Sequence, residues 1–262
     1  MKIIVPVKQV PEVADVKVNP ETGTLIRDGV PSILNPFCEY AVEAGIQLKE
    51  AHGGEVTVIT MGPPQAVDAL YKALAMGSDK AVHMTDREFA GADTWVTALT
   101  LAEQIKKMEY DIIICGKQAI DGDTAQVGPE IAEILGIPQV CYVRHLEIDK
   151  GGKHVIVHRE TDEGYEVVKV KMPVLLTATK GLNEPRLPNI MGIMKAKKKP
   201  LEIVTAEDLG VDTDRLGLSG SPTQVRNVFP PPKRAGGIKL EDVDPKEAAK
   251  QLVEFLAKKG GI

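Results

Sequence analysis

The stretch DIIICGKQAIDGDTAQVGPEIAEILG, residues 111–136, joins three kinds of local structure. Its start, Asp111–Cys115, is almost purely apolar, as is typical of a parallel strand buried on both faces. Polar residues and glycines follow, and Thr124–Leu135 has the apolar spacing of a helix, which Gly136 is expected to end. A buried strand that leads through a polar loop into a helix is half of a β-α-β unit.

The same alternation occurs toward the N-terminus. Short apolar runs predict strands, and runs with apolar residues at i, i+3, i+4 and i+7 predict helices. The strands are expected at Lys2–Val7, Glu55–Met61 and Lys80–Met84, and the helices at Pro36–Ala51, Gln65–Met76 and Asp93–Met108. Because right-handed crossovers place helices on both faces of a parallel sheet, we expect an α/β fold with an open, doubly wound, mostly parallel sheet.

The pattern changes after Gly136. Three runs alternate polar and apolar residues and are separated by turn clusters: Tyr142–Asp149, Lys153–Glu160 and Tyr165–Met172. Such alternation is typical of antiparallel strands with one exposed face, so we expect an antiparallel meander added to the parallel sheet. Val174–Thr179 is expected to be a final strand.

Prolines punctuate the chain from Gly181 to about Gly237, where apolar periodicity is poor. More than about 50 residues without regular structure are unusual inside a compact domain. Because the segment still contains many apolar residues, we expect an arm that packs on another chain, with disorder as the alternative. Pro245–Lys259 is expected to be an amphipathic helix. The expected organisation is an α/β domain over residues 1–180 and a C-terminal arm with a helix over residues 181–262.

The composition argues against several classes of function. The net charge is −5 and the sequence pI about 5.7, which argues against nucleic acid as a partner. No apolar run approaches the roughly 18 residues of a membrane span, and the N-terminus lacks the features of a signal peptide. The three cysteines are far apart and odd in number, which favours a reduced, cytoplasmic protein without a disulfide framework or a metal site.

No GxGxxG motif follows the first strand and no P-loop occurs, which argues against a standard dinucleotide site and against a P-loop nucleotidase. In doubly wound sheets a ligand still binds at the carboxyl ends of the strands, where the strand order reverses. Three segments are expected to meet there: Asn35–Glu39, Met61–Pro63 and Gly116–Gly128.

The last of these segments runs into a helix. Asp123 or Thr124 is expected to cap that helix, and the free N–H groups of its first turn form a site for an anion. Gly122 and Gly128 would let a diphosphate approach the backbone, and the side chains of Thr124 and Gln126 could add hydrogen bonds. An ordinary capped helix start is the alternative, and the local pattern leaves both open.

Two further features have plain interpretations. Cys38 has no histidine near it in sequence, so we expect a small residue packed against a ligand rather than a nucleophile. The lysine cluster at 195 and 197–199 is expected to be solvated or to face a partner, because the chain as a whole is acidic.

Longer motifs carry a resemblance to a known family. They are VPVKQV at 5–10, NPFCE at 35–39, ALAMG at 73–77, GKQAID at 116–121, the stretch 157–166 that leads toward Pro173, NEPR at 183–186 and KAKKK at 195–199. With these motifs in this order, the chain resembles the β subunit of electron transfer flavoproteins over nearly its whole length.

The resemblance implies a heterodimer with an α subunit, an adenine-nucleotide-binding, Rossmann-like α/β domain, and a C-terminal arm that reaches onto the α subunit. It also implies which residues touch the nucleotide. In this chain they are Pro6, Asn35, Pro36, Phe37, Cys38, Met61, Asp121, Gly122, Asp123, Thr124, Ala125, Gln126, Val127 and Gly128.

Conventional members of the family hold AMP in this site, and their loop is similar to DDDCNQTG. This chain instead has DGDTAQVGPE at 121–130, which is similar to the electron-bifurcating and nitrogen-fixation-associated group, where the site holds a second FAD. The resemblance to that group implies that NADH delivers a hydride to this flavin. One electron then goes to the α-subunit FAD and one to a low-potential acceptor. The alternative is a conventional subunit that binds AMP structurally and shuttles electrons from dehydrogenases through the α-subunit FAD.

A second departure lies in the family's partner-recognition loop. In conventional members Tyr-Ala-Thr stands between Asn-Glu-Pro-Arg and Leu-Pro-Asn-Ile-Met. Here the run Leu187-Pro188-Asn189-Ile190-Met191 follows Arg186 directly, and Gly192-Ile193-Met194 comes after it. The apolar anchor residues are therefore Leu187, Ile190 and Met191. An exposed aliphatic anchor suits transient docking, so the resemblance implies dehydrogenase or quinone-reductase-type redox partners. A nucleotide-hydrolysing or adenylylating enzyme on the same fold would need a Ser-Gly-Gly-x-Asp-Ser loop or a His-x-Gly-His turn, and the chain has neither. No catalytic acid, base or nucleophile is expected.

Overall fold

A nine-stranded sheet in the order β11-β5-β4-β1-β6-β10-β7-β8-β9 forms the centre of the fold. We describe residues 1–12, 31–226 and 236–259 of the computed structural model. The strands are β1 (Lys2–Pro6), β4 (Glu55–Met61), β5 (Lys80–Met84), β6 (Ile112–Gly116), β7 (Gln139–Ile148), β8 (His154–Thr161), β9 (Gly164–Lys171), β10 (Val174–Ala178) and β11 (Leu201–Val204). The order reverses at β1, so the sheet is doubly wound, as the sequence predicts.

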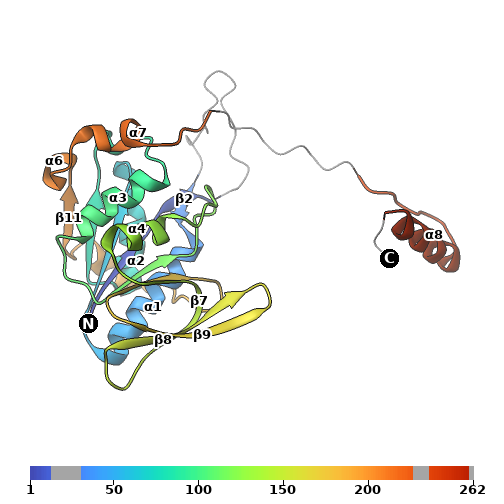
Figure 1. Cartoon of the computed structure of the whole chain (residues 1–262), viewed down its shortest axis with the longest axis horizontal. Coiled ribbons are helices and arrows are strands. Elements are labelled where there is room, and N and C mark those ends of the chain that lie inside the picture. The colour runs from blue at the N-terminus through green and yellow to red at the C-terminus, as the bar shows by residue number, and fades with distance from the viewer. Residues whose placement is uncertain (13–30, 227–235, 260–262) are drawn as a thin grey trace. The chain divides into compact units, whose positions relative to one another are not determined.

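The sheet is parallel over most of its width. Every neighbouring pair from β11 to β7 is parallel, and β7-β8 and β8-β9 are antiparallel. The predicted meander is confirmed, and Figure 1 shows β8 and β9 extending beyond the parallel part of the sheet. Its first strand begins three residues earlier than expected, because residues Gln139–Val143 pair in parallel with β10 before β7 turns to pair with β8.

Four helices cover the two faces of the parallel part. They are α1 (Pro36–His52), α2 (Val67–Met76), α3 (Thr94–Ile105) and α4 (Val127–Leu135). Because side chains alternate along a strand, Ile3 and Val5 of β1 pack in the core beneath α1 and α2, whereas Ile4 packs in the core beneath α3 and α4. The core on both faces consists mainly of aliphatic side chains.

Short elements join these layers. Three 3-10 helices, at Pro64–Ala66, Arg87–Phe89 and Thr213–Arg215, and a two-stranded sheet of β2 (Gln9–Pro11) with β3 (Ser32–Leu34) were not expected from the sequence. Asp93 caps α3, because its carboxylate accepts a hydrogen bond from the Val96 N–H at 3.0 Å.

The segment after residue 180 is more regular than its sequence pattern indicates. It contains α5 (Ile190–Ala196), α6 (Ala206–Leu209) and α7 (Gly217–Gly220), and β11 extends the sheet by pairing with β5. The expectation of an irregular arm is therefore wrong for residues 190–220. Elements of four to seven residues are too short to produce a visible apolar period, so the sequence pattern did not predict them.

The chain divides into two compact units, Met1–Val228 and Phe229–Ile262. The boundary expected after residue 180 does not coincide with this division, because β11 belongs to the large sheet. Residues 227–235 and 260–262 of the expected arm lie outside the described residues. The second unit contains the predicted C-terminal helix, α8 (Pro245–Lys258), capped by Asp244. That residues 181–262 pack on a partner subunit stays a prediction.

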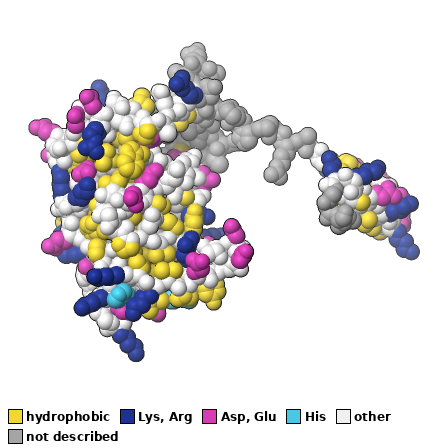
Figure 2. All heavy atoms as spheres, viewed as in Figure 1, with side chains coloured by type: hydrophobic (Ala, Val, Ile, Leu, Met, Phe, Trp, Pro, Cys, Tyr) yellow, Lys and Arg dark blue, Asp and Glu magenta, His cyan; other side chains and the backbone are white. Residues whose placement is uncertain are grey.

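Charged side chains of both signs are interspersed on the face drawn in Figure 2, and hydrophobic side chains gather near its middle. No large patch of one sign is visible on that face. Within residues 1–12, 31–226 and 236–259, no helix is both long enough and apolar enough to span a bilayer.

Candidate functional site

Asn35 joins two of the three segments that were expected to meet at the carboxyl edge of the sheet. It precedes α1 and is buried. Its Nδ2 donates to the Gln118 carbonyl at 2.8 Å, and its Oδ1 accepts from the Ile120 N–H at 3.1 Å. One amide side chain therefore satisfies both a carbonyl and an N–H of the loop after β6, which only an amide can do with this geometry.

The backbone of the two segments is also in close contact. A Cβ at Gly116, the last residue of β6, would lie 2.7 Å from the Phe37 carbonyl carbon and 2.8 Å from the Cys38 nitrogen. Glycine is therefore required where the start of α1 crosses the end of β6. Pro6 ends the adjacent strand β1, and Met61 ends β4, which is the next strand in the sheet.

A salt bridge ties the loop after β6 to the segment after β1. Lys8 Nζ lies 2.7 Å from Asp121 Oδ1, and the Lys8 carbonyl accepts a hydrogen bond from the Asn35 N–H. Asp123 is also engaged, because its carboxylate accepts a hydrogen bond from Gln118 Nε2. Both acidic side chains of the loop thus have donors, which reduces the repulsion that an anionic ligand would meet.

The helix after this loop starts later than predicted. It begins at Val127 rather than Thr124, because Asp123 and Ala125 have left-handed backbone conformations with φ of 54° and 55°. The prediction that Asp123 or Thr124 caps the helix is wrong. The N-cap residue is Gln126, and among the described residues no side chain accepts a hydrogen bond from the first turn. The N–H groups of Val127 and Gly128 face outward from an uncapped helix start, which suits an anion.

The two glycines of the loop have different surroundings. Gly122 is exposed, and a Cβ there would meet no atom within 4 Å. Gly128 is buried, and a Cβ there would lie 3.0 Å from Thr177 Cγ2. The missing side chain of Gly128 therefore serves close packing of α4 on β10, whereas the missing side chain of Gly122 leaves open space. Thr124 and Gln126 are exposed beside that space.

Cys38 is buried beside Asn35, and burial raises the pKa of its thiol. A protonated, buried thiol is a packing residue rather than a nucleophile. Within the described residues no three histidine, cysteine, aspartate or glutamate side chains are grouped so that they could hold a metal ion.

A separate group of apolar residues is exposed in residues 187–194, which we call the docking segment. Leu187 is 91% exposed and Ile190 is 78% exposed. Met191, Ile193 and Met194 are exposed as well. Asn189 caps α5 by accepting from the Gly192 N–H. The structure does not place these side chains in the strand-end group, because their segment packs on α1 and α2.

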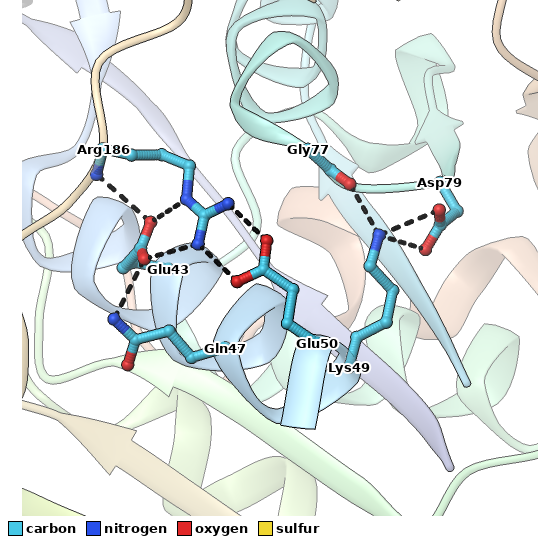
Figure 3. Close-up of polar contacts among 7 residues, drawn as sticks. All are labelled: Glu43, Gln47, Lys49, Glu50, Gly77, Asp79 and Arg186. Carbon is cyan, nitrogen blue, oxygen red and sulfur yellow. Dashed lines mark hydrogen bonds and ion pairs between the residues drawn. The ribbon is translucent and has the colours of Figure 1, made fainter. Parts of the chain in front are cut away.

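Arg186 anchors the start of the docking segment (Figure 3). Its Nε lies 2.8 Å from Glu43 Oε2 and its Nη1 lies 2.6 Å from Glu50 Oε1, both on α1. Glu43 is buried, and its Oε2 also accepts from the Arg186 N–H at 3.1 Å. The hydrogen bonds from Arg186 hold the pKa of Glu50 below its usual value. A planar guanidinium that spans two carboxylates fixes both position and orientation.

Two more contacts hold the rest of the segment. A Cβ at Gly192 would lie 2.5 Å from the Ala75 carbonyl oxygen of α2, so α5 and α2 are in close contact there. Lys199 donates to the Leu74 and Ser78 carbonyls at the end of α2. One lysine of the basic cluster is therefore structural, while the side chains of Lys195, Lys197 and Lys198 are exposed.

The structure thus brings together Pro6, the Asn35–Cys38 segment and the loop that contains Asp121–Gly128, with Met61 on the neighbouring strand. Lys8 was not predicted to belong to this group, and Gln118 was predicted only as part of the segment Gly116–Gly128. Both stand in quoted motifs, but only the fold shows that Lys8 reaches Asp121 and that Gln118 receives Asn35.

Comparison with known proteins shows the family of the chain. Residues 22–209 match the electron transfer flavoprotein domain. The chain belongs to the electron transfer flavoprotein family, as a β subunit. Its role is therefore electron transfer as one subunit of an electron transfer flavoprotein complex.

Three relatives illustrate the similarity. The electron transfer flavoprotein subunit beta of Thermoanaerobacterium thermosaccharolyticum is 55% identical over 98% of both chains. Subunit CarD of the caffeyl-CoA reductase-Etf complex of Acetobacterium woodii is 49% identical over 99% of both chains. Protein FixA of Azorhizobium caulinodans is 43% identical over 99% of this chain and 95% of its own.

Proposed function

We propose that this β subunit binds FAD at the carboxyl edge of its parallel sheet. In a heterodimer with the α subunit, it takes electrons from NADH and passes one to the α-subunit FAD and one to a low-potential acceptor. Its site consists of Pro6, the Asn35–Cys38 segment, Met61 and residues 121–128.

One observation supports a dinucleotide more than any other. The uncapped start of α4 lies directly after an open loop at Gly122. A diphosphate needs backbone donors and room close to them. The N–H groups of Val127 and Gly128 are the two donors that the start of α4 offers, because Pro129 has no N–H and the Glu130 N–H donates to the Gln126 carbonyl. The salt bridge from Lys8 to Asp121 and the hydrogen bond from Gln118 to Asp123 reduce the repulsion between these carboxylates and an anionic ligand. The residues therefore fit the group.

The chain's own residues bind and orient rather than react. Backbone N–H groups at the start of α4 would hold the diphosphate, and Asn35 fixes the loop against α1. The Pro6 and Phe37 side chains and the buried Cys38 supply apolar surface that excludes water. When bound, the flavin supplies hydride acceptance and one-electron transfer.

We further propose that the docking segment contacts the redox partners, which are dehydrogenases or quinone-reductase-type proteins. Its apolar side chains are exposed although the segment is firmly anchored. Exposed apolar residues on a fixed support are what a transient protein interface needs.

Nucleotide analysis of the purified heterodimer tests the proposal. The complex is denatured, and the FAD and AMP released are quantified per heterodimer. We expect two FAD and no AMP, followed by flavin reduction on NADH titration. One FAD with one AMP would contradict the proposal and indicate a conventional carrier. Release of neither nucleotide would contradict the assignment of the strand-end site itself.

A further inference from the structure

Tyr142 has an unusual backbone conformation at the carboxyl edge of the sheet. Its φ is +62°, in the left-handed region that favours glycine or asparagine. It lies in β7 where the pairing with β10 shifts register, and its N–H donates to Thr177 Oγ1 at 2.9 Å. A bulky residue in this conformation costs about 1–2 kcal/mol, and its ring is only half-buried. Core packing of the ring therefore does not explain why a tyrosine occupies this position.

Lys117 lies over the Tyr142 ring. The distance from Lys117 Nζ to the ring centroid is 5.1 Å, within the range of a cation–π interaction. The Lys117 N–H donates to the Ala178 carbonyl at 2.8 Å, so the lysine is fixed just beyond the ends of β6 and β10. Ammonium and ring thus form one small platform.

This platform adjoins the start of α4. Thr177 lies between the two, because its Oγ1 accepts from the Tyr142 backbone N–H at 2.9 Å and its Cγ2 would lie 3.0 Å from a Cβ on Gly128. The Thr177 side chain therefore separates the backbone of Tyr142 from Gly128 at the start of α4.

The sheet order gives the direction of the ligand. The proposed nucleotide contacts lie at the ends of β4 and β1 and in the loop after β6, which are neighbouring strands of the sheet. Doubly wound sheets bind dinucleotides across the point where the order reverses, with the two halves on opposite sides. A ligand that extends beyond β6 along this edge would next meet the ends of β10 and β7, where Lys117 and Tyr142 lie.

Resting on the proposed FAD site, we propose that Tyr142 and Lys117 bind the flavin half of the dinucleotide. Tyr142 offers an aromatic surface for a planar ring system, and Lys117 offers a cation for the carbonyl oxygens of that ring. AMP lacks this half and would not reach the platform. These two residues would then distinguish FAD from AMP at this site.

The test compares two ligands on the same complex. The heterodimer is stripped of exchangeable nucleotide, and the dissociation constants of AMP and of AMP-displaceable FAD are measured by absorbance and calorimetry. Tyr142→Asn keeps the left-handed backbone that asparagine tolerates and removes the ring. We expect it to weaken FAD at least about tenfold, as the loss of one aromatic stack does, and to leave AMP unchanged. Tyr142→Phe is expected to retain FAD affinity, and Lys117→Gln to weaken FAD selectively.

Tyr165→Asn is the matched control, because Tyr165 is an exposed tyrosine on β9. It is expected to change neither constant. Equal FAD affinity in Tyr142→Asn and the natural protein would overturn the inference, and so would an equal loss of FAD and AMP. If the natural protein binds AMP but no AMP-displaceable FAD, the proposed function fails first and the inference fails with it.

Discussion

At the scale of single residues, Arg186 shows that the partners of a residue in a sequence motif become known only from the fold. In the sequence it is the last residue of the motif NEPR, and the motif does not indicate which acidic residues it pairs with. In the structure its guanidinium bridges Glu43 and Glu50 on α1, more than 130 residues earlier in the chain. Glu43 is buried, and Arg186 donates three hydrogen bonds to its carboxylate.

We predict that Arg186→Gln lowers the free energy of unfolding by about 1–3 kcal/mol, because it leaves the buried Glu43 carboxylate without its cation. Chemical denaturation of the complex measures this. Arg186 lowers the pKa of Glu50 in the folded protein. The stability that this pair contributes is therefore fully present above the pKa of an unfolded glutamate, about 4.3. It is lost as the pH falls through the lower pKa of the folded state. The difference between variant and natural protein should therefore narrow below about pH 4.

Arg87→Gln is the control, since Arg87 is an exposed arginine in the 3-10 helix at Arg87–Phe89. It is expected to change stability by less than about 0.5 kcal/mol. A stability loss in Arg186→Gln no larger than that of the control would show that the bridge is not what holds the docking segment.

At the scale of elements, the sequence predicted that α4 follows β6 and a loop, but it did not predict where α4 begins. Strand, loop and helix were predicted in the correct order, because the apolar run of β6 and the spacing of α4 are strong local signals. The start of the helix was misplaced by three residues. The sequence pattern does not predict the left-handed conformations of Asp123 and Ala125. They occur in a loop that contacts Asn35 and Lys8, which are distant in sequence.

The same limit applies to β11. A four-residue strand has too few residues for a period, and its pairing with β5 depends on a contact more than 115 residues away in sequence. By contrast, the strand-end residues could be placed from topology, because the carboxyl ends of parallel strands lie on one edge.

The two loop glycines give a prediction at this scale. Gly128→Val should lower the free energy of unfolding by about 1–3 kcal/mol, because its side chain would push α4 away from Thr177 on β10. Gly122→Val should leave stability within about 0.5 kcal/mol, because space is open there, but should weaken nucleotide binding if a diphosphate approaches the loop. Thermal unfolding and nucleotide titration separate the two effects. Equal stability losses in both variants would contradict the assignment of distinct roles.

At the scale of the whole molecule, the described fold separates two tasks. The proposed nucleotide contacts lie at the carboxyl edge of the sheet, where the first helix begins. The docking segment is fixed by Glu43 and Glu50, farther along the same helix. Helix α1 thus connects the two sites through one rigid element, so that a change in the docking segment need not disturb the nucleotide site.

This separation predicts that docking can be weakened alone. Leu187→Ala and Met191→Ala are expected to raise the KM for a dehydrogenase or quinone-reductase-type partner by about 5–30-fold each, because each removes an exposed apolar anchor worth about 1–2 kcal/mol. Electron transfer to ferricyanide, which needs no docking surface, should be unchanged, as should the nucleotide content. Ile203→Ala, an exposed apolar residue on β11, is the matched control. If the two docking variants slow ferricyanide reduction as much as the protein acceptor, the segment acts on the flavin site and not on partner recognition.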